Sequence, residues 1–207
     1  MKKIVLFSII GLMFFACEPK EPNNIDYNTP EEIGVEINGV MWSPYNVSTT
    51  GKFVANVEDY GGLYQWNRKD TANFLLDNDY YESSYLIATS WLPANNPCPT
   101  GWRVPTSAEI ESLLDETAVT KRTIEGEGGK GTAGRRFTDN TTNNSIFLPA
   151  AGLRNPENGI TNGTVFNGYY WSKESVYSFD AYYFSIMVAE LRYAGKAFGM
   201  SVRCVKE

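Results

Sequence analysis

The sequence predicts an α+β domain of mostly short antiparallel strands, with one or two helices and long loops. Three observations indicate this class. An Asn-Gly pair separates alternating apolar residues in 35–42, a capped helix start occupies 106–114, and apolar residues alternate along 182–188. With 207 residues, of which 43% are hydrophobic and 20% charged, the chain is long enough to bury the core of one domain.

The first seventeen residues, MKKIVLFSIIGLMFFAC, are typical of a secretory signal peptide. Two lysines precede an apolar run of about 12 residues, which at about 1.5 Å each covers about 18 Å. A hydrocarbon layer is about 30 Å thick, so this run is too short to span it. The ending FFAC resembles a bacterial lipoprotein signal, although Phe14 stands where leucine is usual. The resemblance implies a lipid on Cys17, with plain secretion as the alternative.

A polar segment with prolines, EPKEPNNIDYNTPEE, follows at 18–32. It has no apolar period, so we expect a flexible tether. Several acyl chains on Cys17 would hold the protein at a membrane surface, since one chain alone binds weakly. We therefore expect an outer-membrane lipoprotein, periplasmic or surface-exposed, whose folded domain covers 33–207.

The folded part is expected to open with a hairpin. In VEINGVMW (35–42), Asn38 and Gly39 lie between two short apolar segments. Asn-Gly is the preferred two-residue hairpin turn because both residues tolerate positive φ. Farther on, TANFLLD (71–77) fits either a short helix or a short strand.

The segment CPTGWRVPTSAEIESLL (98–114) predicts a helix with a defined beginning. Thr106 and Glu109 have the spacing of a capping box, in which each side chain accepts a hydrogen bond from the backbone of the other residue. Apolar residues follow at helical spacing, so one face of the helix is expected to be buried. These residues are Ile110, Leu113 and Leu114.

The polar, glycine-rich stretch from 120 to 144 is expected to form a long surface loop. Its glycines formally match a dinucleotide-binding pattern, and Lys130 suggests a phosphate site. We reject both interpretations because no strand pattern precedes the glycines and no helix pattern follows. A phosphate-binding loop also needs lysine directly before Ser or Thr, whereas Gly131 separates Lys130 from Thr132.

The last sixty residues are expected to be rich in strands. Apolar side chains alternate along 182–188, and the terminal GMSVRCV (199–205) places Met200, Val202 and Cys204 on one face. Eleven aromatic residues lie between Phe166 and Phe198. Most of them are expected in the core, where large apolar side chains are usually buried.

Three cysteines are present, at positions 17, 98 and 204. If Cys17 carries lipid, Cys98 and Cys204 remain and should form a disulfide in an oxidising compartment. In the chain-entropy model, a disulfide that closes such a long loop stabilises the folded domain by about 4 to 5 kcal/mol. Two buried free thiols are the alternative, and metal binding by two distant cysteines is less favoured.

The composition argues against several functions. The chain has no histidine, which is the commonest general base and metal ligand. Its 24 acidic residues outnumber 18 basic ones, whereas nucleic-acid binding needs clustered positive charge. The carboxylate pairs Glu58–Asp59 and Glu109–Glu111 have spacings that point their side chains in different directions. We therefore expect that the protein is not an enzyme and that it has no cofactor, no metal site and no nucleic-acid partner.

Five motifs in order resemble the Fibrobacter succinogenes major paralogous domain family over about residues 33–207: EDYGGLYQW, CPTGWRVPTSAEIESLL, LPAAGLRN, GYYWSKES and GMSVRCVKE. RVPTSAEIE is also similar to the helix start of formylglycine-generating enzymes, which share the C-type-lectin-like fold. The resemblance implies this fold, with adjacent first and last strands and a disulfide from the terminal strand to the helix region. It implies no active site, because those enzymes use a cysteine pair near the carboxyl end, where only Cys204 lies here.

The segment from Gly168 to Val205 is similar to the variable region of lectin-like proteins that bacterial retroelements diversify. This resemblance implies a ligand surface at Ser175, Tyr177, Phe179, Asp180, Arg192 and Tyr193. Tyrosine suits such a surface because it offers a large contact area at low entropic cost. We expect a non-enzymatic module that binds a glycan or protein ligand at the cell surface. The alternatives are a structural component of a surface appendage or envelope assembly, and a carboxylate-based enzyme of formylglycine-generating-enzyme-like fold.

Overall fold

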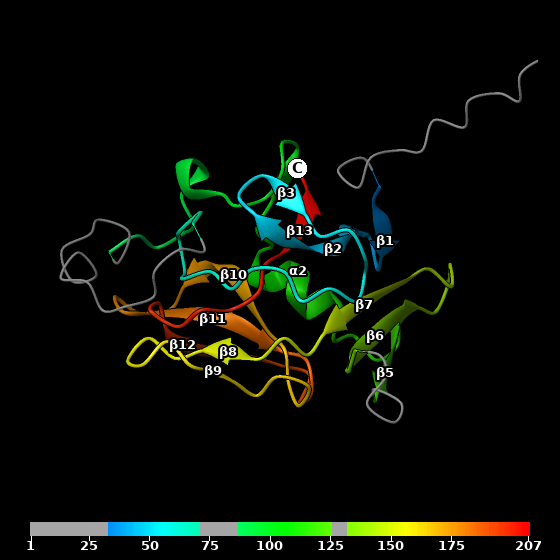
Figure 1. The fold of residues 1–207 in the computed structure, drawn as a ribbon. Helices are drawn as coiled ribbons and strands as arrows, with labels where there is room; N and C mark the ends of the chain where they lie inside the picture. Colours follow the sequence, from blue (N-terminus) through cyan, green and yellow to red (C-terminus); the bar gives the residue numbers. More distant parts are fainter. Residues whose placement is uncertain (1–32, 71–86, 126–131) are drawn as a thin grey trace, which may run out of the picture.

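The computed structural model describes residues 33–70, 87–125 and 132–207 (Figure 1). In this part of the chain, short antiparallel strands form small sheets, accompanied by one α-helix and one 3-10 helix. These are α2 (Ser107–Ser112) and η1 (Pro93–Asn95). The predicted antiparallel strands are confirmed, whereas the predicted α+β class is not, because the described residues are mostly β with a single α-helix. Cys17, the leader, the tether and the segment 71–77 lie outside the described residues.

The first sheet brings the beginning and the end of the domain together. Its strand order is β1-β2-β13-β4, with β3 paired to β2, so the first hairpin lies beside the last strand. Its strands are β1 (Val35–Ile37), β2 (Val40–Thr49), β3 (Lys52–Phe53), β4 (Trp102–Arg103) and β13 (Arg203–Lys206). Asn38 and Gly39 have φ angles of 47° and 76°, which confirms the predicted hairpin turn.

Three smaller sheets complete the described part of the chain. Their strands are β5 (Val119–Ile124), β6 (Gly134–Asp139) and β7 (Ser145–Pro149); β8 (Leu153–Arg154) and β9 (Thr161–Asn162); and β10 (Tyr169–Ser175), β11 (Asp180–Ser185) and β12 (Glu190–Gly195). Each of these sheets is antiparallel. None of the helices among the described residues has the length and apolar character to cross a membrane.

The prediction of a long surface loop over 120–144 is wrong. β5 pairs with β6, and β6 pairs in turn with β7. Phe137 is buried, whereas its neighbour Arg136 is exposed, so β6 contributes side chains both to the core and to the solvated surface. The charged and hydroxyl side chains that made the segment look like a loop lie largely on the solvated side. Buried β7 covers the other edge of β6 and supplies the apolar residues that the polar strands lack. The glycine stretch 126–131 lies outside the described residues.

The β10–β12 sheet separates two hydrophobic clusters. Tyr170 pairs with Phe184, and both side chains belong to the first cluster. Trp171 pairs with Tyr183, and these residues pack in the second cluster. Successive residues in a strand point to opposite faces, which explains this division. The helix α2 packs against β10, β11 and β12 from the first side, where Ile110 and Leu113 are buried (Figure 1).

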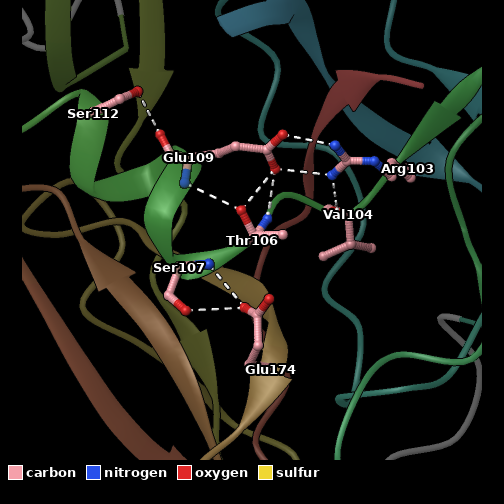
Figure 2. A network of polar contacts seen from close by, with 7 residues as sticks. All are labelled: Arg103, Val104, Thr106, Ser107, Glu109, Ser112 and Glu174. Atoms are coloured by element: carbon pink, nitrogen blue, oxygen red, sulfur yellow. Dashed lines mark hydrogen bonds and ion pairs between the residues drawn. The ribbon is translucent and has the colours of Figure 1, made fainter.

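The helix begins with the predicted capping box (Figure 2). The Glu109 amide donates to Thr106 Oγ1 at 3.1 Å, and the Thr106 amide donates to Glu109 Oε2 at 2.8 Å. Arg103 holds the same carboxylate with two hydrogen bonds of 2.8 and 2.6 Å. Burial acts to raise the pKa of Glu109, but the hydrogen bonds from Arg103 and Thr106 together lower it below its ordinary value. The carboxylate is therefore charged and fully engaged in organising the helix start.

The predicted disulfide between Cys98 and Cys204 is confirmed, with an S–S distance of 2.04 Å and Cα atoms 6.1 Å apart. It ties the last strand, β13, to the segment that leads into β4 and the helix. One residue before the second cysteine, the side chain of Arg203 is completely buried and donates to Asn46 Oδ1 and to the carbonyls of Ser43 and Phe147. Burial lowers the pKa of Arg203 to about 10. Covalent and polar links thus fix the last strand on both sides.

Candidate functional site

Three exposed aromatic side chains lie at one end of the β10–β12 sheet, and we call them the aromatic surface. They are Tyr177, Phe179 and Tyr193, whose exposed fractions are 60%, 63% and 57%. Tyr177 and Phe179 belong to the loop between β10 and β11, whereas Tyr193 lies on β12. The rings of Tyr177 and Tyr193 meet edge to face, with centroids 5.8 Å apart. Such pairs add about 0.5–1.5 kcal/mol beyond the area they bury, so this contact helps to order the surface.

The strand register decides which predicted residues share a face. Tyr182 pairs with Tyr193, and Asp180 pairs with Gly195 on the same side of the sheet. Arg192 pairs with Tyr183 and therefore points to the opposite side. Of the six residues predicted for the ligand surface, Arg192 therefore lies on the other side of the sheet from Asp180 and Tyr193. Asp180 and Tyr193 do lie on one face, and Tyr182 joins them there.

Arg192 has its own partners on the other side of the sheet. It forms an exposed ion pair with Glu190, with N–O distances of 2.9 Å. Burial raises the pKa of Tyr183, and the charge of Arg192 acts in the opposite direction. Since Arg192 engages Glu190 away from the aromatic rings, it is separate from the aromatic surface.

Ser175 contributes to the shape of the loop that carries the two exposed rings. Its hydroxyl lies 2.6 Å from the carbonyl oxygen of Tyr177 and 2.9 Å from that of Asp180, and it donates its proton to one of them. Tyr177 and Asp180 also exchange two backbone hydrogen bonds of 3.3 Å. The role that the structure gives Ser175 is therefore to close the loop.

Lys196 supports the same loop from below. Its side chain is only 1% exposed, and its ammonium donates to the carbonyls of Ser178 at 2.9 Å and Ala88 at 3.1 Å. The Lys196 amide donates to the carbonyl of Phe179 at 2.8 Å. The ammonium also lies 4.5 Å from the centre of the Trp66 ring, a cation–π contact. Burial lowers the pKa of Lys196, and the charge of Asp180 opposes this effect.

These hydrogen bonds order the loop that carries two of the exposed rings. Lys196 and Ser175 hold its carbonyls, which restricts the conformations that the loop can adopt. The role of Lys196 was not predicted from the sequence, because a lysine near the end of a strand pattern is normally taken as solvated. Tyr182 was not predicted as part of the ligand surface either, although it pairs with Tyr193 across the sheet.

Among the described residues, no group of three or more Asp, Glu or Cys side chains is arranged to hold a metal ion. The carboxylate of Glu109, considered for acid–base chemistry, is occupied by Arg103 and the helix start. The arrangement at the aromatic surface offers rings, hydroxyls and one nearby carboxylate, Asp180. These groups are suited to non-covalent recognition.

Comparison with protein families matches residues 25–206 to the Fibrobacter succinogenes major domain. A search of curated proteins and a search of solved structures found no match. The family match spans the described strands, the helix and both disulfide cysteines, and it agrees with the resemblance drawn from the five sequence motifs. The chain therefore belongs to the Fibrobacter succinogenes major domain family.

Proposed function

We propose that the protein is a cell-envelope lipoprotein whose domain binds a macromolecular ligand, a glycan or a protein, through the aromatic surface. Lipid on Cys17 would anchor it to the outer membrane, and residues 18–32 would act as the tether. The domain itself would have the C-type-lectin-like fold. Two features support that fold: the first hairpin pairs with the last strand, and a disulfide links the last strand to the helix region.

The observation that carries the binding proposal is the exposure of Tyr177, Phe179 and Tyr193 on a fixed framework. Large apolar side chains are usually buried, and a cluster of exposed ones commonly marks an interaction site. Tyrosine combines contact area with a hydroxyl and has few rotatable bonds, so it suits binding surfaces. The hydrogen bonds of Lys196 and Ser175 keep the loop in place before any ligand arrives.

The proposal is tested with the full-length protein extracted from membranes in mild detergent. Glycan arrays and pull-downs from native envelopes identify the ligand, and a variant with Y177A, F179A and Y193A is compared with the wild type. We expect the variant to lose binding at least about tenfold, because central aromatic residues carry about 2 kcal/mol or more each in typical interfaces. F166A provides the control, since Phe166 is also exposed but lies outside the aromatic surface. An unchanged interaction profile in the triple variant contradicts the proposal.

The anchor is tested separately. Mass spectrometry of the mature protein should find Cys17 at the amino terminus carrying acyl chains, and C17S should shift the protein from the membrane fraction to the soluble fraction. Uncleaved protein with an unmodified Cys17 in the membrane fraction would contradict the lipid anchor. It would leave the binding proposal unaffected.

A further inference from the structure

A cavity of about 150 Å³ lies beside the helix start, and it is built from segments far apart in the sequence. The lining comes from three parts of the chain and from its last residue: Trp91, Leu92, Pro93 and Asn96; Arg103 and Val104; Lys173 of β10; and Glu207. The Trp91 amide donates to the Lys173 carbonyl at 2.7 Å, and the Lys173 amide donates to the Pro105 carbonyl at 2.7 Å. Backbone hydrogen bonds therefore hold these three parts of the chain in fixed positions.

One side of the cavity is apolar and rigid. It is lined by Trp91, Leu92 and Val104. The Trp91 indole donates to the carbonyl of Asn95 at 2.8 Å, which fixes the ring, and the Leu92 amide donates to Asn67 Oδ1 at 2.7 Å. Leu92 remains 42% exposed at the rim, which leaves apolar area for a ligand to cover.

The other side carries three charged groups, Arg103, Lys173 and Glu207. The Arg103 guanidinium is oriented by its two hydrogen bonds to Glu109, and only part of its donor set is used there (Figure 2). Within the described residues, the Lys173 ammonium forms neither an ion pair nor a hydrogen bond. Lys173 is half-buried, and none of the carboxylates in the described part of the chain forms an ion pair with it. A ligand with an anionic group would supply this missing partner.

We propose that this cavity binds a single sugar ring that bears a carboxylate, as in a uronic acid. The carboxylate lies at Lys173, where it supplies the missing counter-charge, and the free donors of Arg103 assist. The ring rests against Leu92, the exposed part of the apolar side, and Glu207, which also lines the cavity, accepts hydrogen bonds from ring hydroxyls. Inorganic phosphate is a poorer fit, because it has no apolar face that could pack against the apolar side of the cavity. The cavity, at about 150 Å³, is smaller than the sites of about 300–1,000 Å³ that hold drug-sized ligands, so its volume suits a single ring.

The test uses full-length protein in mild detergent and two sugars that differ by one group. Glucuronate and glucose are titrated separately, with saturation-transfer NMR and tryptophan fluorescence as readouts. We expect glucuronate to bind at least about tenfold more tightly than glucose, because only glucuronate offers a charged acceptor to the Lys173 ammonium, and such charge-assisted hydrogen bonds are the stronger ones. The glucuronate affinity should also fall with increasing salt, as expected for a partly exposed charge pair.

Variants separate this site from the aromatic surface. K173M should weaken glucuronate binding about tenfold or more and leave glucose binding unchanged, whereas K173R should largely restore it. L92A, at an exposed position, should weaken both sugars and provides a second test if K173M folds poorly. Y193A is the matched control, because Tyr193 belongs to the aromatic surface and should not alter sugar binding in the cavity.

Three results would overturn the proposal. The first is equal affinity for glucuronate and glucose in the wild type. The second is unchanged glucuronate binding in both K173M and L92A, with thermal unfolding curves that match the wild type. The third is displacement of glucuronate by inorganic phosphate at equal concentration, which would indicate a general anion site. None of these results bears on whether the aromatic surface binds a macromolecule.

Discussion

Tyr177 and Tyr193 lie sixteen positions apart, yet their rings meet edge to face with centroids 5.8 Å apart. The contact joins the β10–β11 loop to β12, so the shape of the exposed surface depends on how that loop is held. Ser175 holds the loop through the carbonyls of Tyr177 and Asp180, and Lys196 holds it through the carbonyl of Ser178. The aromatic surface is therefore a property of the folded sheet and of its buried support, as well as of the rings themselves.

Replacing Lys196 by methionine should loosen the loop and weaken ligand binding while all exposed rings remain. The carbonyls of Ser178 and Ala88 lose their donor, and the free energy of unfolding should fall by about 1–3 kcal/mol. Amide hydrogen exchange should become faster at 176–179. The control is K52M at an exposed position, where neither exchange in the loop nor stability should change beyond about 0.5 kcal/mol. Identical exchange rates in K196M would show that the lysine does not support the loop.

Removing the disulfide should destabilise the domain strongly. Cys98 and Cys204 are 106 positions apart. In the chain-entropy model, closing a loop of this size restricts the unfolded chain and so raises the free energy of unfolding by about 4–5 kcal/mol. Denaturant unfolding of a C98A/C204A variant, or of the wild type with reductant, measures the difference. The C17S variant should unfold like the wild type. If reductant left the unfolding midpoint unchanged, the disulfide would contribute little to stability.

The helix start should depend on Glu109 more than on its neighbour Glu111. E109A removes one half of the capping box and both hydrogen bonds from Arg103, so we expect a loss of about 1–2 kcal/mol. E111A lies on the same helix at an exposed position and should cost less than about 0.5 kcal/mol. Thermal unfolding of the two variants measures the contrast. Equal losses in both would mean that the network at Glu109 is not the source of the helix stability.

Asp139 should make stability depend on acid pH. Its carboxylate accepts backbone hydrogen bonds from Thr142, Asn38 and Thr141, and these lower its pKa from 3.8 to about 2. A carboxyl whose pKa is depressed by folding stabilises the protein above the unfolded-state pKa, and this contribution disappears as pH falls through the folded-state pKa. The free energy of unfolding should therefore decrease as pH drops from about 4 to about 2. In D139N the decrease over this range should be smaller, and an unchanged slope would contradict this role.

The features that the sequence could predict depend on local or covalent rules. The Asn38–Gly39 turn needs only positive φ at two neighbouring residues, and the capping box needs only Thr106 and Glu109 at a fixed spacing. The pairing of Cys98 with Cys204 follows from counting cysteines in an oxidising compartment. The turn, the capping box and the disulfide can each be predicted without knowing how the rest of the chain folds.

The features that were missed depend on contacts between distant segments. β5 and β6 are polar strands, and their own composition suggested a loop; their sheet is completed by the buried strand β7, which pairs with β6. Lys196 is buried only because two loops bring carbonyl oxygens to it. Arg192 is different: adjacent residues of a strand point to opposite faces, so its separation from Tyr193 could have been predicted once β12 was recognised.

Binding through the aromatic surface is tested most directly by the dissociation constant of the full-length protein for its macromolecular ligand, measured for the wild type and for the triple variant Y177A/F179A/Y193A. We expect the constant to rise at least about tenfold in the variant, while F166A leaves it unchanged and all proteins unfold at similar denaturant concentrations. A constant that is the same in the triple variant and the wild type, for every ligand detected, would contradict the claim that this surface performs the binding.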